Sequence, residues 1–256
     1  MKAYTNIKKI EQKQKIGVMF SVAGVLIMAV ALFISLQPES PLASWGFLGA
    51  LGGLAVASIG TYHVNRWLRP PLPEPLLEKT LERFDSRHVL FNHFPIHPVP
   101  HLLLTPKGLI PIKVKRYEGK VVYDKEKARW HSEYSLRMLY QLYFKGLTAE
   151  WLGNPTEEAA QAVNDVKSWL QVHLPDLAAA IPVEAVVLFL SSKAELHHAD
   201  EAPIPVTQPA SLKKELQERF AEGNPLSKET YRRLRDALET GVTEMPAITQ
   251  PRRSRR

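Results

Sequence analysis

The chain has 256 residues, no cysteine and a formal net charge of +7. Disulfide bonds and cysteine-based metal sites are therefore excluded. The basic balance favours anionic partners such as nucleic acid or lipid headgroups, and a membrane protein with basic cytoplasmic segments would show the same balance.

Two uncharged apolar segments near the N-terminus, 16–36 and 42–62, are each long enough to cross a bilayer, since a spanning helix needs about 20 apolar residues. Residues 37–41 between them have the sequence QPESP, which is typical of the turn of a helical hairpin. A signal peptide is a poorer interpretation of the first segment, because a second apolar segment follows at once and no small-residue cleavage pattern intervenes.

The basic residues around these segments predict which side of the membrane each end occupies. Residues 1–15 contain five lysines, residues 37–41 contain neither lysine nor arginine, and Arg66 and Arg69 follow the second segment. Lysine and arginine concentrate on the cytoplasmic side. We therefore expect an integral plasma membrane protein with two spans in the lipid bilayer, residues 37–41 outside and both termini in the cytoplasm.

Small residues in the second segment predict how the two helices pack. Small side chains let helices approach closely, so we expect contact within the hairpin, with dimerisation as the alternative. The segment contains Gly46, Gly49, Gly52 and Gly53.

The remaining chain divides by composition into a linker, a domain and a tail. Residues 63–75 are expected to form a proline-rich linker, in which the sequence PPLPEP at 70–75 should be stiff and extended. Residues 76–242 have the length of one domain. Residues 243–256 form a basic tail that we expect to be disordered; contact of the tail with anionic lipid or nucleic acid is the alternative.

The pattern of apolar residues in the domain predicts an α/β sandwich with a mixed sheet. Helices are expected at 75–84, 156–173, 211–220 and 227–240. Strands are expected at 88–94, 101–105, 109–115, 120–124, 183–190 and 204–208. Turns at 106–108 and 118–119 should join three of these strands into an antiparallel meander. The expected helix N-caps are Asn154, Ser211 and Ser227.

Several pieces of the domain together resemble the nuclease-related domain (NERD) family. They are HLLLTPKGLIPIKVKRYEGKVVY at 101–123, Trp130, GNPTEEAAQAVNDVKSWL at 153–170 and VEAVVLFL at 183–190. The family pattern is D-H followed by apolar residues, a glycine turn, E-x-K, a tryptophan, and N-P-x-x-Q-A at the start of a helix. The resemblance covers about residues 76–210 and implies a fold similar to the PD-(D/E)xK restriction-endonuclease-like fold.

The resemblance also implies where a nuclease site would lie and what it has lost. In the family, two carboxylates hold Mg²⁺, which prefers oxygen ligands; the metal activates water, and the lysine stabilises the reacting phosphate. Here Pro100 stands at the aspartate position and Lys113 at the glutamate position, so that only Lys115 remains of this set. Glu158 stands at the glutamine position. We therefore expect an inactive domain without a cofactor, with Mg²⁺ required only if nuclease activity survives.

Three function classes follow from these residues. The first is a membrane-anchored, inactive nuclease-like domain that binds nucleic acid or a protein partner through a basic region. The second is an active metal-dependent nuclease with substitute carboxylates, and the third is a membrane scaffold with no nucleic-acid role. The predicted anion-binding residues are Lys107, Lys113, Lys115, Arg116 and Lys120. The candidate carboxylates are Glu78 and Glu158, with Glu118 and Glu74 as further choices.

Other chemistry has weaker support in the sequence. Histidines occur at 88, 93, 97 and 101, but their spacing follows no zinc pattern, and strand alternation would place them on both faces of a sheet. The chain has no G-x-S-x-G sequence, phosphate loop or dinucleotide fingerprint. We therefore predict no metal site.

Overall fold

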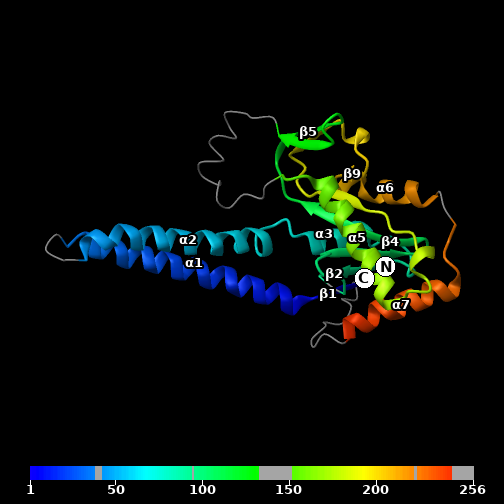
Figure 1. Ribbon diagram of the computed structural model, residues 1–256, viewed down its shortest axis with the longest axis horizontal. Coiled ribbons are helices and arrows are strands. Elements are labelled where there is room, and N and C mark those ends of the chain that lie inside the picture. Colours follow the sequence, from blue (N-terminus) through cyan, green and yellow to red (C-terminus); the bar gives the residue numbers. More distant parts are fainter. Residues whose placement is uncertain (38–41, 94, 133–151, 222–223, 244–256) are drawn as a thin grey trace. The chain divides into compact units, whose positions relative to one another are not determined.

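The computed structural model describes residues 1–37, 42–93, 95–132, 152–221 and 224–243 (Figure 1). Residues 38–41 of the predicted turn at 37–41 and residues 244–256 of the predicted tail at 243–256 lie outside the described residues. The chain forms two compact units. Of the described residues, one unit combines 1–7 with those of 73–132 and 152–243, and the other holds those of 8–72. The helical hairpin is therefore inserted into the sequence of the domain.

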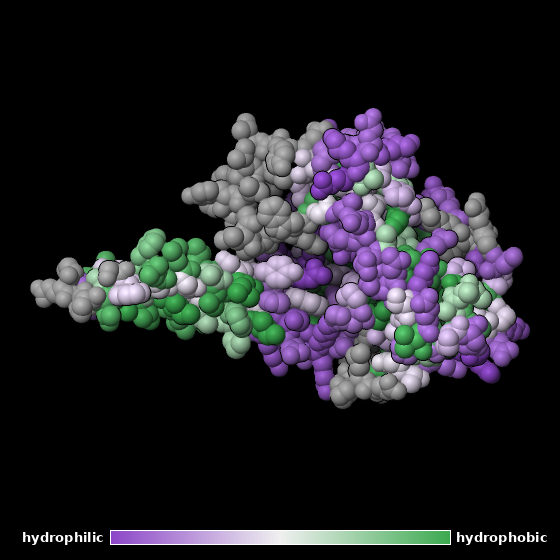
Figure 2. Space-filling view, in the orientation of Figure 1, coloured by the Kyte–Doolittle hydropathy of each residue, from purple (hydrophilic) through white to green (hydrophobic). Residues whose placement is uncertain are grey.

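Two helices make the hairpin: α1 (Ile7–Ser35) and α2 (Ala43–Trp67). Both are long and apolar enough to cross a membrane, and Figure 2 shows hydrophobic residues covering their surface. A Cβ atom on Gly24 of α1 or on Gly60 of α2 would collide with backbone atoms of the opposite helix. The glycines thus allow close packing within the hairpin, as predicted.

The ends of the hairpin differ from the prediction. Helix α1 begins nine residues before the apolar segment, so that the lysine-rich residues continue the same helix. Helix α2 extends to Trp67, and α3 (Pro73–Leu81) begins after a short break. Residues 63–67 and 73–75 of the predicted linker are therefore helical, and the predicted extended conformation of 70–75 is wrong from Pro73 onward. Proline at the first position of α3 favours this early start, because its missing N–H needs no partner there.

A six-stranded mixed sheet forms the centre of the domain, in the order β1-β2-β3-β4-β7-β9. Its strands are β1 (Lys2–Thr5), β2 (Val89–Asn92), β3 (His101–Thr105), β4 (Gly108–Lys115), β7 (Val186–Phe189) and β9 (Val206–Thr207). Strands β2, β3 and β4 pair antiparallel, whereas β1 with β2, β4 with β7, and β7 with β9 pair parallel. This confirms the predicted mixed sheet and the short edge strand.

The predicted three-stranded meander is only partly correct. Strand β5 (Gly119–Asp124) does not pair with β4 but leaves the main sheet. It forms a second sheet between β6 (Arg129–Ser132) and β8 (Ala194–His197). Gly119 has a φ of +106°, a conformation that glycine adopts without strain, and its N–H bonds to the carbonyl oxygen of Lys193. This turn directs the chain out of the main sheet.

Helices cover both faces of the main sheet (Figure 1). Helices α5 (Pro155–His173) and α7 (Lys228–Thr243) pack on one face, where Val166 and Leu238 meet Phe91 in one apolar core. Helices α3 and α6 (Pro209–Ala221) pack on the other, where Leu77 and Leu216 meet Leu103. Two short 3₁₀ helices, at Ala178–Ala180 and Ala199–Glu201, complete the domain. The predicted α/β sandwich is confirmed.

The predicted helix caps have different outcomes. Ser227 is confirmed, because its hydroxyl oxygen accepts a hydrogen bond from the N–H of Thr230 at 3.0 Å. Ser211 is wrong: α6 begins at Pro209 and contains it. Asn154 precedes α5, but its side chain makes no hydrogen bond to the helix backbone. It accepts one from the hydroxyl of Thr156 instead, at 3.0 Å.

Strand β1 was not predicted, and it joins the extreme N-terminal residues to the domain. The Tyr4 ring is buried and stacks on Phe91 with the ring centroids 5.5 Å apart. The Lys2 ammonium pairs with Glu239 of α7 at 3.4 Å. The segment before the hairpin is thus an edge strand of the sheet, rather than only a basic extension.

We therefore expect residues 1–7 to be required for a stable domain. In one test protein, a flexible linker of about ten residues replaces the hairpin and joins Ile7 to Pro73, so that β1 is kept. A second, shorter protein consists of residues 70–256 and leaves the edge of β2 without its neighbouring strand. The shorter chain should unfold at a lower temperature, as measured by circular dichroism. Equal melting temperatures would contradict a structural role for β1.

Within the joined chain, Tyr4→Ala should lower the free energy of unfolding by about 3 kcal/mol, because it removes a buried aromatic side chain. Lys2→Ala removes a partly exposed ion pair and an ammonium group 4.5 Å from the centroid of the Tyr4 ring, and should cost only about 1 kcal/mol. Urea denaturation of the two variants makes the comparison, and equal losses would argue against packing by Tyr4 as the cause.

Candidate functional site

Strand β4 presents Lys113 and Lys115 toward α5. Successive side chains of a strand point to opposite faces, so these two lysines share one face. Ile112, the residue of β4 before Lys113, points to the other face and joins the core under α3 and α6. The Lys115 side chain is 5% exposed and that of Lys113 is 28% exposed. A lysine as buried as Lys115 requires a partner of opposite charge.

Glu158 is that partner for both lysines. It lies in the first turn of α5. Its Oε1 atom accepts a hydrogen bond from the Lys115 ammonium, and its Oε2 atom contacts the Lys113 ammonium, each at 2.6 Å. Each carboxylate oxygen therefore holds one ammonium group. We call Lys113, Lys115 and Glu158 the lysine clamp.

The surroundings of the lysine clamp keep the carboxylate ionised. Burial raises the pKa of Glu158, but the hydrogen bonds from Lys113 and Lys115 and their positive charges lower it by more, so that the pKa lies below its ordinary value. Gly153, with a φ of +58°, lies directly beside the pair: a Cβ there would be 2.7 Å from Glu158 Oε1. Glycine lets the backbone approach the carboxylate from this side.

The clamp leaves little room for the metal chemistry that the sequence comparison implies. Extending the β3–β4 register sets Pro100, which has no ligand atom in its side chain, opposite Lys113. Both oxygens of Glu158 already hold ammonium groups. Among the residues that the structure describes, no group of three or more His, Asp or Glu side chains is arranged to hold a metal ion.

The other predicted basic residues do not all lie beside the clamp. Lys107 is in the turn between β3 and β4, at the far end of an eight-residue strand, which puts it about 20 Å from Lys115. Arg116 directly follows Lys115, and Lys120 lies in β5 opposite Glu195 of β8. The five residues thus form at least two separate basic regions rather than one.

A second cluster of polar residues, which the sequence did not predict, lies on the α3 face of the sheet. Thr5, Asn92 and His101 occupy neighbouring positions on β1, β2 and β3. His101 Nδ1 donates to Asn92 Oδ1 at 2.9 Å, Asn92 Nδ2 donates to Thr5 Oγ1 at 2.9 Å, and Thr5 Oγ1 donates to Glu78 at 2.9 Å. We call this set the polar ladder.

Glu74 and His93 extend the polar ladder. Glu74 Oε1 accepts a hydrogen bond from His93 Nε2 at 2.6 Å, and both side chains are buried. The rings of His93 and His101 lie 5.3 Å apart. The assumption of strand alternation failed here because His93 follows the end of β2 with a φ of 67°, a left-handed conformation.

The sheet therefore separates the candidate carboxylates. Glu158 lies on the α5 face beside Lys115, whereas Glu74 and Glu78 lie on the α3 face with the polar ladder. Glu118 is exposed in the loop after β4. The structure brings only Glu158 to the position where the family pattern has its lysine.

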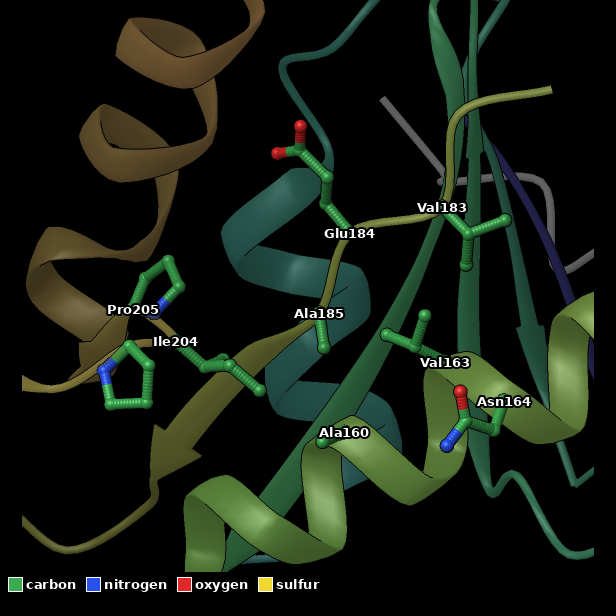
Figure 3. A pocket seen from close by; sticks show the side chains of 9 residues that line it. Ala160, Val163, Asn164, Val183, Glu184, Ala185, Ile204 and Pro205 are labelled. Atoms are coloured by element: carbon green, nitrogen blue, oxygen red, sulfur yellow. The ribbon is translucent and has the colours of Figure 1, made fainter. Parts of the chain in front are cut away.

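A pocket of about 400 Å³ opens elsewhere, between α5, the segment before β7 and the segment before β9. The side chains of Val163, Ala185 and Ile204 converge on it in Figure 3, and Glu184 is its one ionisable lining residue. It shares no residue with the lysine clamp or the polar ladder. Its lining offers no arrangement of groups for catalysis.

The pKa of Glu74 leads to a test of the polar ladder. Burial raises this pKa, but the hydrogen bond from His93 and the charges of His101 and His93 lower it further, to below its ordinary value of 4.5. A carboxyl with a lowered folded pKa stabilises the fold fully above its unfolded pKa, and this stabilisation is lost as the pH falls through the folded pKa.

Glu74→Gln should therefore flatten the fall of the free energy of unfolding between about pH 5 and pH 3. Glu82→Gln is the control, because it removes the same charge from an exposed residue at the end of α3. Denaturation of both variants and the unchanged chain across this range makes the measurement. A slope for Glu74→Gln equal to that of Glu82→Gln would contradict the role of Glu74.

Comparison with known proteins identifies the family of the chain. Residues 60–190, just over half of the chain, match the family described as the nuclease-related domain. No significant match was found among curated proteins or among solved structures. The matched residues run from the end of α2 to β7 and include both lysines of the clamp and Glu158. The chain therefore belongs to the nuclease-related domain (NERD) family, with a mixed α/β domain similar to the PD-(D/E)xK nucleases.

Proposed function

We propose that this chain is a membrane-anchored NERD protein whose domain does not cut nucleic acid but binds it, or binds a protein partner, at the cytoplasmic face of the plasma membrane. The observation that carries the proposal is the lysine clamp. Lys113 replaces a carboxylate, and Glu158 is neutralised by two ammonium groups.

The charge of the clamp argues against metal-dependent hydrolysis. Magnesium needs carboxylate oxygens, usually with water completing its shell. Two ammonium groups and one carboxylate leave the clamp with a net positive charge, which repels a divalent cation and attracts an anion. Nucleic acid is the first candidate partner because its phosphates are bound by lysine and arginine without regard to sequence.

Membrane attachment is supported by the hairpin and by the position of β1. Strand β1 precedes the hairpin and β2 follows it, yet the two strands are neighbours in one sheet. If both helices cross the bilayer, the start of α1 and the end of α2 must lie on the side of the membrane that holds the domain. The lysines at the start of α1 and Arg66 in the last turn of α2 favour the cytoplasm as that side.

We expect the full chain, in nanodiscs, to bind labelled single- or double-stranded DNA or RNA without cleaving it in Mg²⁺, Mn²⁺ or EDTA. Binding should weaken as salt is raised. Cleavage that needs metal and is lost in Glu158→Ala would overturn the proposal in favour of an active nuclease that uses Glu158. Neither binding nor cleavage would favour a protein partner or a scaffold without a nucleic-acid role.

The membrane topology can be measured cleanly because the chain has no native cysteine. We introduce one cysteine at a time, as Gln37→Cys after α1 or as Glu126→Cys in the exposed turn between β5 and β6. In intact cells, a membrane-impermeant maleimide should label Gln37→Cys only, and Glu126→Cys should react only after permeabilisation. Labelling of both or of Glu126→Cys alone would contradict two spans with a cytoplasmic domain.

A further inference from the structure

The lysine clamp has the arrangement of a bound anion and its receptor within one chain. Two ammonium groups from one strand each meet a separate oxygen of the same carboxylate at 2.6 Å. Short charge-assisted contacts of this kind are the ones that lysines make with phosphate. We propose that Lys113 and Lys115 form a site for a phosphate group of an external ligand, and that Glu158 occupies this site as a built-in competitor. The proposal deepens, and rests on, the proposed binding function.

The exposure of the three side chains gives such a ligand an approach. Lys115 is almost fully buried and forms the floor of the site, whereas about a third of the Glu158 side chain and 28% of the Lys113 side chain are exposed. The carboxylate therefore lies at the open side. A rotation of the Glu158 side chain away from the lysines would free both ammonium groups.

The glycine at position 153 keeps the space beside the carboxylate free of a side chain. Gly153 has no side chain there, and the position of its absent Cβ is 2.7 Å from Glu158 Oε1 and 3.6 Å from the Lys115 ammonium. Glu158 also lies in the first turn of α5, where the helix dipole favours negative charge. A phosphate in place of the carboxylate would keep the same two ammonium partners and the same helix end.

An external phosphate should bind weakly as long as Glu158 occupies the site. Glu158 is covalently held next to the lysines, so its effective concentration at the site is high. An external phosphate binds only the fraction of molecules in which the site is open, and its apparent affinity is reduced by that fraction. Removing the negative charge at 158 should increase this fraction.

The neighbouring residue supplies a matched control. Glu157 lies in the same helix turn and carries the same charge, but its carboxylate accepts a hydrogen bond from the Asn154 side chain at 3.2 Å. Glu157→Gln and Glu158→Gln change the net charge of the chain equally. Only Glu158→Gln releases Lys113 and Lys115.

The test is calorimetric titration of the full chain in nanodiscs with inorganic phosphate and, separately, with a short single-stranded oligonucleotide. We expect Glu158→Gln to bind phosphate at least about tenfold more tightly than the unchanged chain. The phosphate affinity of Glu157→Gln should differ from that of the unchanged chain by less than about twofold. Adding Lys113→Gln to Glu158→Gln should abolish the gain. Equal affinities for the two glutamine variants, or a gain that survives the loss of Lys113, would overturn the inference.

The two ligands separate this inference from the proposed function. Tighter phosphate binding with no oligonucleotide binding supports the phosphate site and contradicts a nucleic-acid partner. Oligonucleotide binding that ignores Glu158→Gln and Lys113→Gln supports the proposed function and overturns the phosphate site. Should Glu158→Gln fail to fold, Glu158→Asp keeps the charge but is one methylene shorter. A gain in phosphate affinity supports the inference there too, and no gain overturns it.

Discussion

The parallel pairing of β1 with β2 is the constraint on which the arrangement of the chain depends. It joins residues 2–5 to residues 89–92 and makes the hairpin an insertion between two adjacent strands. The pairing also places Thr5 beside Asn92, so that the polar ladder reaches from the sheet to Glu78 on α3. Both connections between the hairpin and the domain therefore lead to one edge of the sheet and the helix that packs on it.

Charge has been rearranged, rather than removed, at the position of the family's catalytic site. The family pattern has a carboxylate on the strand and a neutral glutamine on the helix; this chain has Lys113 on the strand and Glu158 on the helix. In this chain, Lys115 has the carboxylate of Glu158 within reach. A buried lysine without a partner is costly, and this requirement accounts for the pairing of Lys115 with an acidic residue.

Sequence patterns could predict those parts of the fold whose information is local. The apolar helices of the hairpin, α5 and the buried strand β7 each carry a long continuous pattern. Strand β1 has only four residues, and its partner lies more than eighty positions away. Strand β5 looked like the next strand of a meander because pattern alone cannot tell which sheet a strand joins.

The candidate site was predicted in its members but not in its contacts. Lys113, Lys115 and Glu158 were each named from the sequence, yet their pairing across 43 positions depends on α5 crossing the face of β4. The polar ladder was missed because its residues come from three strands and a helix, and because His93 leaves the strand alternation. Histidine spacing along the chain gave no signal for a contact made between strands.

The position of β1 has a consequence for the order in which the protein is made. Its four residues leave the ribosome before the two apolar helices, and β2 leaves only after both helices have been synthesised. Until then β1 has no neighbour in the sheet, and closing so long a segment carries an entropic cost. Insertion of the hairpin into the bilayer would bring its two ends together and reduce that cost. The membrane would then act as a template for folding of the domain as well as its anchor.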